Sequence, residues 1–524
     1  MVEKNPVITQ ATNPGNNKDA VDLIKGLLFN FLGMALKLGK FLFILVAAKF
    51  YGAAALGIYF LAWSAVDIAS KLGLWGMDKS LIRDIARRSS RQNAETNQQI
   101  LSIIYFNVRV VLFFSMIVAA IVFWAAPLVA HFIFNDASLV APMRILSLAI
   151  PFTVLTLVLI ATTKALRLMQ YEAFIRQGLE PAVLLTVTFV LIPFSLGATG
   201  LVLAHLIASF AASVAAFVVV LRKYKHLGWP PQPLSREVKI ETFRYTSPIA
   251  AMDFLNLSVA RTDIVLVGAL MSSTAAGLYG VAIEIISVIK RVRQGLEPVF
   301  APIVSELFHN AQQQRLQRNY VLVTRWLLAG SLLPVIAMLI FPGQILSFFD
   351  IHSRQAAAAL MVLALAHGLF GTFSAAESLL VMTGKTLLNA GLGALMLTVN
   401  IALGWVLIPE LGLVGAALGT LTAFFTVSGA RVYYGYKQFQ LWPFDVSLLW
   451  PLATAASAAT VFYLLKSQLN VDTLLETVTL FMAMPVVYAL TYFLGASEPE
   501  EKYLFDKLKR KFKKNRAHQN EDAL

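Results

Sequence analysis

The sequence contains no cysteine and few charged residues. None of its 524 residues is cysteine, and only 14% are Asp, Glu, Lys or Arg. The first absence excludes disulfide bonds, thiolate metal sites and cysteine nucleophiles. A soluble protein carries about 25% charged residues, so this chain has too few of them to cover a water-exposed surface. These shortages indicate a protein whose surface faces lipid.

Long apolar stretches account for most of what the sequence does contain. Hydrophobic residues make up 58% of the chain, and the mean hydropathy is +0.70. A bilayer core of about 30 Å is crossed by about 20 apolar residues in a helix. We therefore predict an all-α, polytopic membrane protein with about 14 transmembrane helices, near residues 22–50, 53–77, 100–125, 138–163, 178–195, 199–221, 246–270, 274–299, 318–340, 356–382, 387–408, 411–433, 446–465 and 472–494.

The distribution of Lys and Arg predicts the orientation of these helices. With the N-terminus placed in the cytoplasm, about 30 of the 43 basic residues fall in cytoplasmic segments and three in segments on the opposite side. Basic residues favour the cytoplasmic side, so both termini and the loop 223–245 are expected there. Residues 1–21 are polar and read as a cytoplasmic tail. They do not resemble a signal peptide, because the apolar run after them is too long.

The formal net charge of +14 could suggest a nucleic-acid partner. The basic residues, however, lie between apolar runs and in the tail 496–524, so we expect membrane lipids and no nucleic acid. The tail contains KLKRKFKKNR at 507–516. This stretch could anchor the tail to anionic lipids, or it could serve only to fix the orientation of the chain.

An internal repeat divides the chain into two similar halves. Ala54-Ala-Leu-Gly-Ile-Tyr59 reappears as Thr274-Ala-Ala-Gly-Leu-Tyr279, and Leu196-Gly-Ala-Thr-Gly200 reappears as Leu411-Gly-Leu-Val-Gly415. Repeats offset by an even number of helices are related by an axis along the membrane normal. We predict two pseudo-symmetric six-helix lobes, residues 22–222 and 246–434, followed by two further helices in 446–495.

Several motifs resemble a known family. They are Lys49-Phe-Tyr-Gly52, Leu72-Gly-Leu-Trp-Gly76, Arg261-Thr-Asp-Ile-Val-Leu-Val-Gly268, Ala276-Gly-Leu-Tyr-Gly-Val-Ala282, and Thr383-Gly-Lys385 followed by Asn400, Ile408-Pro409 and Gly412-Leu-Val-Gly-Ala-Ala417. In order and spacing, over about residues 22–495, they resemble the multidrug/oligosaccharidyl-lipid/polysaccharide exporter superfamily. The polysaccharide (O-antigen type) flippase branch is the most similar.

The resemblance implies a transporter of the inner (plasma) membrane. Its substrate would be a lipid-linked oligosaccharide on a polyprenyl pyrophosphate, moved by alternating access for cell-surface polysaccharide biosynthesis. Polysaccharide polymerase machinery is a candidate partner. Two alternatives stay open at this point: a cation-coupled multidrug exporter of the same superfamily, and a membrane-embedded glycosyltransferase or polymerase.

No enzyme site is visible in the sequence. Gly384-Lys385-Thr386 mimics the end of a phosphate-binding loop, but Leu379 stands where that motif needs glycine. The seven histidines show no metal-ligand spacing, and no pair of carboxylates suits glycosyl transfer. We expect neither an enzyme nor a bound metal, and no cofactor beyond a coupling ion, H⁺ or Na⁺.

Basic residues inside the predicted membrane helices form the candidate substrate site. A charge at bilayer depth is costly unless it faces water, a partner or a substrate. Seven of them fall on helices 1, 2, 7 and 8, which the resemblance places along the cleft between the lobes. We predict a cationic cavity for the pyrophosphate that contains Asn30, Lys37, Lys40, Arg261, Lys290, Arg291 and Arg293, with Lys71 as the remaining base.

Acidic residues on the same helices offer two further interpretations. Asp67 and Lys71 are four residues apart on one helix and are expected to form a structural ion pair. Asp263 and Glu284 could likewise neutralise the bases. Alternatively, Asp67, Asp253, Asp263 or Glu284 could couple transport to an ion gradient. Three other basic residues, Arg109, Arg144 and Arg325, lie toward helix ends and are expected to reach the interface.

Overall fold

A computed structural model describes residues 38–89, 94–224, 233–469 and 474–494. Within these ranges the regular structure is helical and contains no strand, which confirms the predicted all-α fold. The chain divides into two compact units, Met1–Val281 and Ala282–Leu524. They are called the N-terminal unit and the C-terminal unit below, and each is described by itself. The predicted boundaries of lobes, loops and tails stay a prediction.

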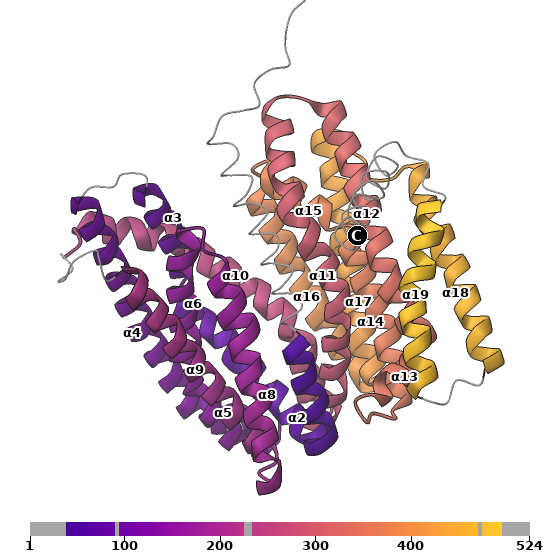
Figure 1. The fold of residues 1–524 in the computed structure, drawn as a ribbon, viewed down its shortest axis with the longest axis horizontal. Helices are drawn as coiled ribbons and strands as arrows, with labels where there is room; N and C mark the ends of the chain where they lie inside the picture. Colours follow the sequence, from indigo (N-terminus) through magenta and orange to yellow (C-terminus); the bar gives the residue numbers. More distant parts are fainter. Residues whose placement is uncertain (1–37, 90–93, 225–232, 470–473, 495–524) are drawn as a thin grey trace, which may run out of the picture. The chain divides into compact units, whose positions relative to one another are not determined.

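The N-terminal unit is a bundle of long helices, drawn in indigo to magenta in Figure 1. Its elements are α2 (Leu38–Leu74), α3 (Met77–Ser89), α4 (Ala94–Phe132), η1 (Ala137–Leu139), α5 (Val140–Ser147), α6 (Ala149–Ala165), α7 (Gln170–Glu172), η2 (Ala173–Leu179), α8 (Glu180–Leu191), η3 (Ile192–Phe194), α9 (Ala198–Tyr224), α10 (Arg236–Leu270) and the first turns of α11 (Ser273–His309).

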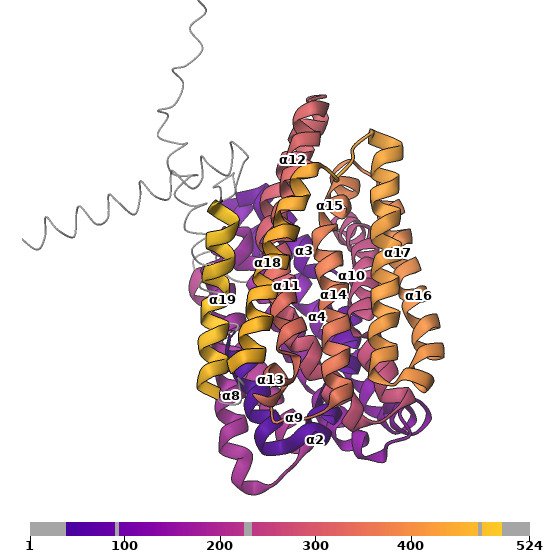
Figure 2. The same ribbon diagram turned by 90° about the vertical axis from the view of Figure 1, so that its right-hand side faces the viewer.

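The C-terminal unit contains the rest of α11 and, in the part of the chain that the structure describes, nine further elements. They are α12 (Gln313–Ile340), α13 (Pro342–Ser347), α14 (Arg354–Thr372), α15 (Ser374–Met382), α16 (Thr386–Leu411), α17 (Leu413–Phe439), η5 (Val446–Leu448), α18 (Leu449–Leu469) and α19 (Leu474–Leu494). Buried apolar side chains of α11, α12, α15 and α17 form one core cluster. The last two helices, α18 and α19, pack against α12 (Figure 2).

Ten helical runs in the described residues are long and apolar enough to cross a membrane. Each predicted segment coincides with helix wherever the structure describes it. The number of these runs is lower than the number of predicted segments for three physical reasons. The first two predicted segments run into one helix, α2, which kinks at Gly52 with φ +79°, a left-handed conformation that favours glycine. In addition, α10 and α11 carry many charges, and the apolar part of α19 is short.

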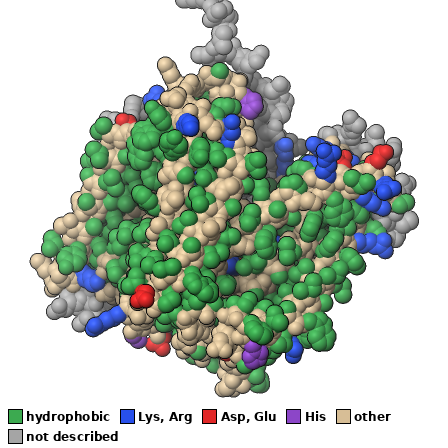
Figure 3. Space-filling model, turned by 180° about the vertical axis from the view of Figure 1, so that it is seen from behind, with side chains coloured by type: hydrophobic (Ala, Val, Ile, Leu, Met, Phe, Trp, Pro, Cys, Tyr) green, Lys and Arg blue, Asp and Glu red, His purple; other side chains and the backbone are tan. Residues whose placement is uncertain are grey.

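The exposed side chains are those expected of a chain that lies in lipid. Hydrophobic side chains, among them Phe113, Met116 and Trp124, are exposed along the helix flanks. Figure 3 shows such side chains covering most of the visible flanks, with Lys and Arg mainly toward the helix ends. An apolar surface of this extent is typical of a membrane protein, since soluble monomers rarely expose contiguous apolar patches of more than a few hundred Å².

Candidate functional site

Helix α10 packs along α2 and α3, and this packing builds the first charged site. Ser235 caps the helix by accepting a hydrogen bond from the Val238 N–H at 3.4 Å. Farther along, Gly268 lies against Leu61: a Cβ at Gly268 would stand 2.4 Å from that leucine side chain. The missing side chain therefore lets α10 approach α2 closely, which brings polar groups of the two helices together.

Arg261 on α10 forms an ion pair with Asp67 on α2. The guanidinium Nη2 donates to Asp67 Oδ2 at 2.8 Å, and both side chains are 18% exposed. The expected partner of Asp67 was Lys71, one turn away on the same helix, and that expectation is wrong. The guanidinium of Arg261 on the neighbouring helix reaches the Asp67 carboxylate with good hydrogen-bond geometry, although the two residues are 194 positions apart in the sequence.

Three more polar residues surround this pair. Lys40, Asp67 and Arg261 all act electrostatically on His205 of α9, and Lys40 and Asp67 act on Glu180 of α8. We call Lys40, Asp67, Glu180, His205 and Arg261 the N-terminal charge cluster. It contains two basic side chains, two carboxylates and one imidazole, drawn from four helices.

Aromatic contacts and an unusual helical turn position two members of the cluster. The buried Tyr59 hydroxyl lies 2.9 Å from His205 Nδ1, and the ring of Trp63 is 4.0 Å from the imidazole between centroids. Glu180 directly follows η2, which is a π-helix. Pro181 follows this wider π turn and has no N–H to donate back into it. Such turns are frequent at functional sites.

Asp253 and Asp263, two predicted coupling residues, interact with other groups. Asp253 lies near Lys71, Lys79 and Asp78. Asp263 is buried, and its carboxylate lies 3.5 Å from the Tyr279 hydroxyl. Each of these carboxylates thus has surroundings of its own.

The two copies of the first repeat motif touch each other inside the N-terminal unit. A Cβ at Gly57 would stand 1.7 Å from the Ser273 carbonyl oxygen, and a Cβ at Gly277 would stand 2.0 Å from the Ala53 carbonyl oxygen. The backbones of α2 and α11 are therefore in direct contact. Nearby, Asp136 accepts hydrogen bonds from the Ser138 and Ser273 hydroxyls. Partial burial alone would raise the pKa of Asp136, but these hydrogen bonds outweigh it and lower that pKa.

The C-terminal unit has a second charged site. Arg293 of α11 and Arg431 of α17 both donate to Glu377 Oε2 of α15, at 2.9 and 3.0 Å. Arg431 Nε also donates to Asn389 Oδ1 at 3.0 Å, and Arg293 Nε donates to Glu297 Oε2 at 3.1 Å. We call these five residues the C-terminal charge cluster. Both guanidinium groups also lie over the ring of Phe370.

The remaining predicted site residues lie elsewhere in the chain. Glu284, Lys290 and Arg291 are half-buried on α11, and none of them is without a partner. Lys290 acts on the buried His367, whose ring packs on Phe424. Asn30 and Lys37 lie outside the described residues. Thus the structure brings Lys40 and Arg261 to one site and Arg293 to another.

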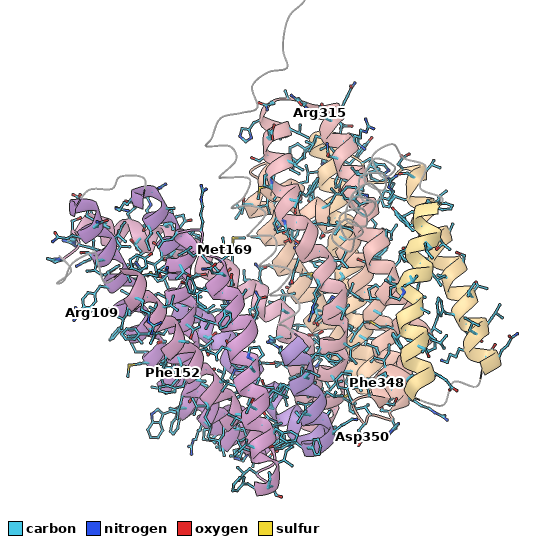
Figure 4. The ribbon with its side chains drawn as sticks, viewed as in Figure 1. Arg109, Phe152, Met169, Arg315, Phe348 and Asp350 are labelled. Atoms are coloured by element: carbon cyan, nitrogen blue, oxygen red, sulfur yellow. The ribbon has the colours of Figure 1, made fainter. Side chains whose placement is uncertain are left out.

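Sequence reasoning missed several members of the two clusters. Arg431 was assigned to a cytoplasmic segment, yet it is 4% exposed and lies within α17. Arg325, expected to reach the interface, is also buried. By contrast, Arg109 is exposed on α4 and points away from the other helices, as expected (Figure 4). One signal was available: Glu377 is a lone acid in an apolar run, and such a charge calls for a partner.

Comparison with known proteins identifies relatives of this chain. The model of a family described as polysaccharide biosynthesis protein matches residues 44–380. No curated protein matches the sequence. Among solved structures, the fold is similar to that of the lipid II flippase MurJ in an inward closed conformation. The TM-score is 0.69 at 14% identity, over 89% of this chain and 97% of that one.

Two other solved structures share the fold. An inward-facing multidrug resistance transporter of the MATE family has a TM-score of 0.62 at 15% identity, over 79% of this chain and 94% of that one. A MOP superfamily transporter from Pyrococcus furiosus has a TM-score of 0.52 at 15% identity, over 80% and 95%. The superfamily predicted from the sequence is thereby confirmed.

Proposed function

Because the chain belongs to the family of polysaccharide biosynthesis proteins, we propose that it is a flippase for a lipid-linked oligosaccharide. Its substrate is a glycan on a polyprenyl pyrophosphate, and its product is the same molecule on the opposite leaflet. The family match over residues 44–380 is the observation that carries this proposal. The fold supports movement of a molecule, since the similar solved structures include a flippase and multidrug transporters.

The chemistry of such a headgroup fits the N-terminal charge cluster. A pyrophosphate needs cations, and the Arg261 guanidinium can bind it with two parallel hydrogen bonds while Lys40 supplies a point charge. Lys37, three residues before Lys40, stays a predicted member of the site. The polyprenyl tail remains in the bilayer, so that the protein has to shield only the headgroup from the hydrocarbon core.

The mechanism, the orientation, the driving ion and the partner in this proposal rest on the sequence. The protein works by alternating access in the inner membrane, with both termini in the cytoplasm. A gradient of H⁺ or Na⁺ drives it, and polysaccharide polymerase machinery takes the glycan after transfer. The excess of Lys and Arg in alternate loops supports this orientation.

The rival function is a cation-coupled multidrug exporter. The shared fold supports it as well, and the carboxylates Asp67 and Glu180 in the N-terminal charge cluster would suit a cationic drug. The seven basic residues counted in the sequence therefore do not reject it by themselves. The family match favours the polysaccharide substrate.

A deletion strain that lacks any second flippase separates the two functions. We expect lipid-linked oligosaccharide to accumulate on the cytoplasmic leaflet, where a membrane-impermeant glycan-modifying reagent cannot reach it from outside. A plasmid copy of the wild-type chain should restore export. Normal glycan export together with new sensitivity to cationic drugs would establish the rival instead.

A further inference from the structure

Arg261, the basic side chain proposed to bind the headgroup, already has a partner. Arg261 is bonded to Asp67, and both side chains are 18% exposed. Lys40 lies close enough to Glu180 to act on its carboxylate. Arg176 of η2 acts on the same carboxylate. The two bases of the N-terminal charge cluster thus face two carboxylates, and an anionic headgroup has to compete with these carboxylates for them.

We propose that Asp67 occupies Arg261 in the empty transporter and that the headgroup phosphate displaces it. A monovalent cation, H⁺ or Na⁺, then neutralises the released Asp67. This inference rests on the proposed function and adds to it how the charge of the released Asp67 is compensated. The Nη2 group that donates to Asp67 serves the phosphate instead, so that binding of the phosphate leaves a half-buried carboxylate without its base.

The physical reason for the linkage is the cost of that uncompensated charge. Taking the base away from a half-buried carboxylate is unfavourable, because part of the remaining charge stays desolvated. A cation that binds Asp67 removes the cost, so it must raise the affinity for the phosphate. By reciprocity the phosphate raises the affinity for the cation by the same factor.

Among the carboxylates of the N-terminal unit, Asp67 fits this role best. Its surroundings include Arg261 on α10, Glu180 on α8 and His205 on α9, together with Lys40 on its own helix. Asp253 lies near Lys71 and Lys79 instead, and Asp263 is buried beside Tyr279. Asp67 is hydrogen-bonded to Arg261, a base proposed to bind substrate.

His205 is the rival acceptor for a proton. Its Nδ1 contacts the Tyr59 hydroxyl, whereas its buried Nε2 has no hydrogen-bond partner in the part of the chain that the structure describes. Asp67 and Arg261 both act on this imidazole. Proton uptake by His205 would couple pH to binding without any exchange at Asp67, and the experiment has to distinguish the two.

The test measures binding of geranylgeranyl pyrophosphate to the full-length protein in lipid nanodiscs. One series varies pH at fixed Na⁺, and a second varies Na⁺ at fixed pH. We expect affinity to rise with one of these cations, approaching about tenfold per pH unit if a single proton is taken up. Asp67→Asn should bind the probe at least as tightly as the wild type and lose that dependence. Asp253→Asn is the matched control and should keep it.

The outcomes separate the exchange from the proposed function. If the wild type does not bind the probe, both proposals fail. Binding that is independent of pH and Na⁺ overturns the exchange alone, as does a dependence that persists in Asp67→Asn but vanishes in His205→Gln. Should Asp67→Asn not be produced, cation uptake on adding the probe is followed in His205→Gln with a pH dye or a Na⁺ electrode. Uptake that persists supports the exchange, and uptake that is lost overturns it.

Discussion

The two charge clusters use the same residue types in different ways. In the N-terminal unit, one hydrogen bond of 2.8 Å joins Arg261 to Asp67, and both side chains are 18% exposed. In the C-terminal unit, Glu377 accepts from two guanidinium groups at once, and Arg431, with its side chain 5% exposed, is also held by Asn389. The first arrangement pairs one guanidinium with one carboxylate, and the second is a network around a shared carboxylate.

This difference indicates different tasks. The Arg261–Asp67 pair can open when a competing anion arrives, because both of its side chains are partly exposed. A network that includes a buried guanidinium cannot lose one member without leaving other charges desolvated. We therefore assign substrate exchange to the N-terminal charge cluster and structural bracing of α11, α15, α16 and α17 to the C-terminal one.

The largest effect is expected from Arg431→Ala. It removes the most buried charge of the C-terminal charge cluster and leaves Glu377 short of a partner, which costs about 3–5 kcal/mol. Membrane abundance and the melting temperature of the solubilised protein should both fall sharply. Lys437→Ala, an exposed residue on the same helix, is the matched control and should change neither. If the two variants were equally stable, the C-terminal charge cluster would not be a structural brace.

Arg261→Ala should separate activity from stability. We expect glycan export to fall at least about tenfold, or ~1.4 kcal/mol in transition-state terms, with membrane abundance near that of the wild type. Arg261→Lys should retain part of the activity, because the phosphate needs positive charge more than a particular geometry. Arg109→Ala, on the exposed face of α4, is the control and should export normally. Loss of the protein itself would instead make Arg261 a structural residue like Arg431.

The smallest effect concerns Asp136, a carboxylate held by serine hydroxyls instead of guanidinium groups. Its pKa is lowered from the ordinary value of 3.8, so its contribution to stability is present above that value and disappears as the pH falls through the folded-state pKa. Asp136→Asn should therefore melt at a slightly lower temperature than the wild type at neutral pH. The two proteins should converge in acid. A gap that stays constant with pH would show that the charge of Asp136 contributes nothing.

The positions of the helices could be predicted from the sequence, but the partners of their charges could not. Apolar length alone located the helices, because a bilayer demands about 20 apolar residues per crossing. The pairing of Asp67 depends on how α10 packs on α2, and no periodicity within one helix contains that information. Local spacing therefore favoured Lys71, whereas the structure selects Arg261.

The placement of Arg431 illustrates a second limit. It lies near the end of the predicted helix 411–433, so that it was counted among the cytoplasmic basic residues, although α17 continues to Phe439 and buries it. Helix ends are where hydropathy is least informative, since basic residues at an interface and basic residues in a buried network look alike in sequence. The site residues Asn30 and Lys37 stay predictions.

The contact between Gly57 and Gly277 makes the internal repeat self-complementary. The same motif position from each copy meets its own counterpart, and the neighbouring backbones are related in the same way, with Ser273 over Gly57 and Ala53 over Gly277. Two identical chains associate by this kind of isologous contact in a twofold-symmetric dimer. In this protein the two copies belong to one polypeptide, so the contact forms without any dependence on concentration, as in a dimer whose subunits have been fused.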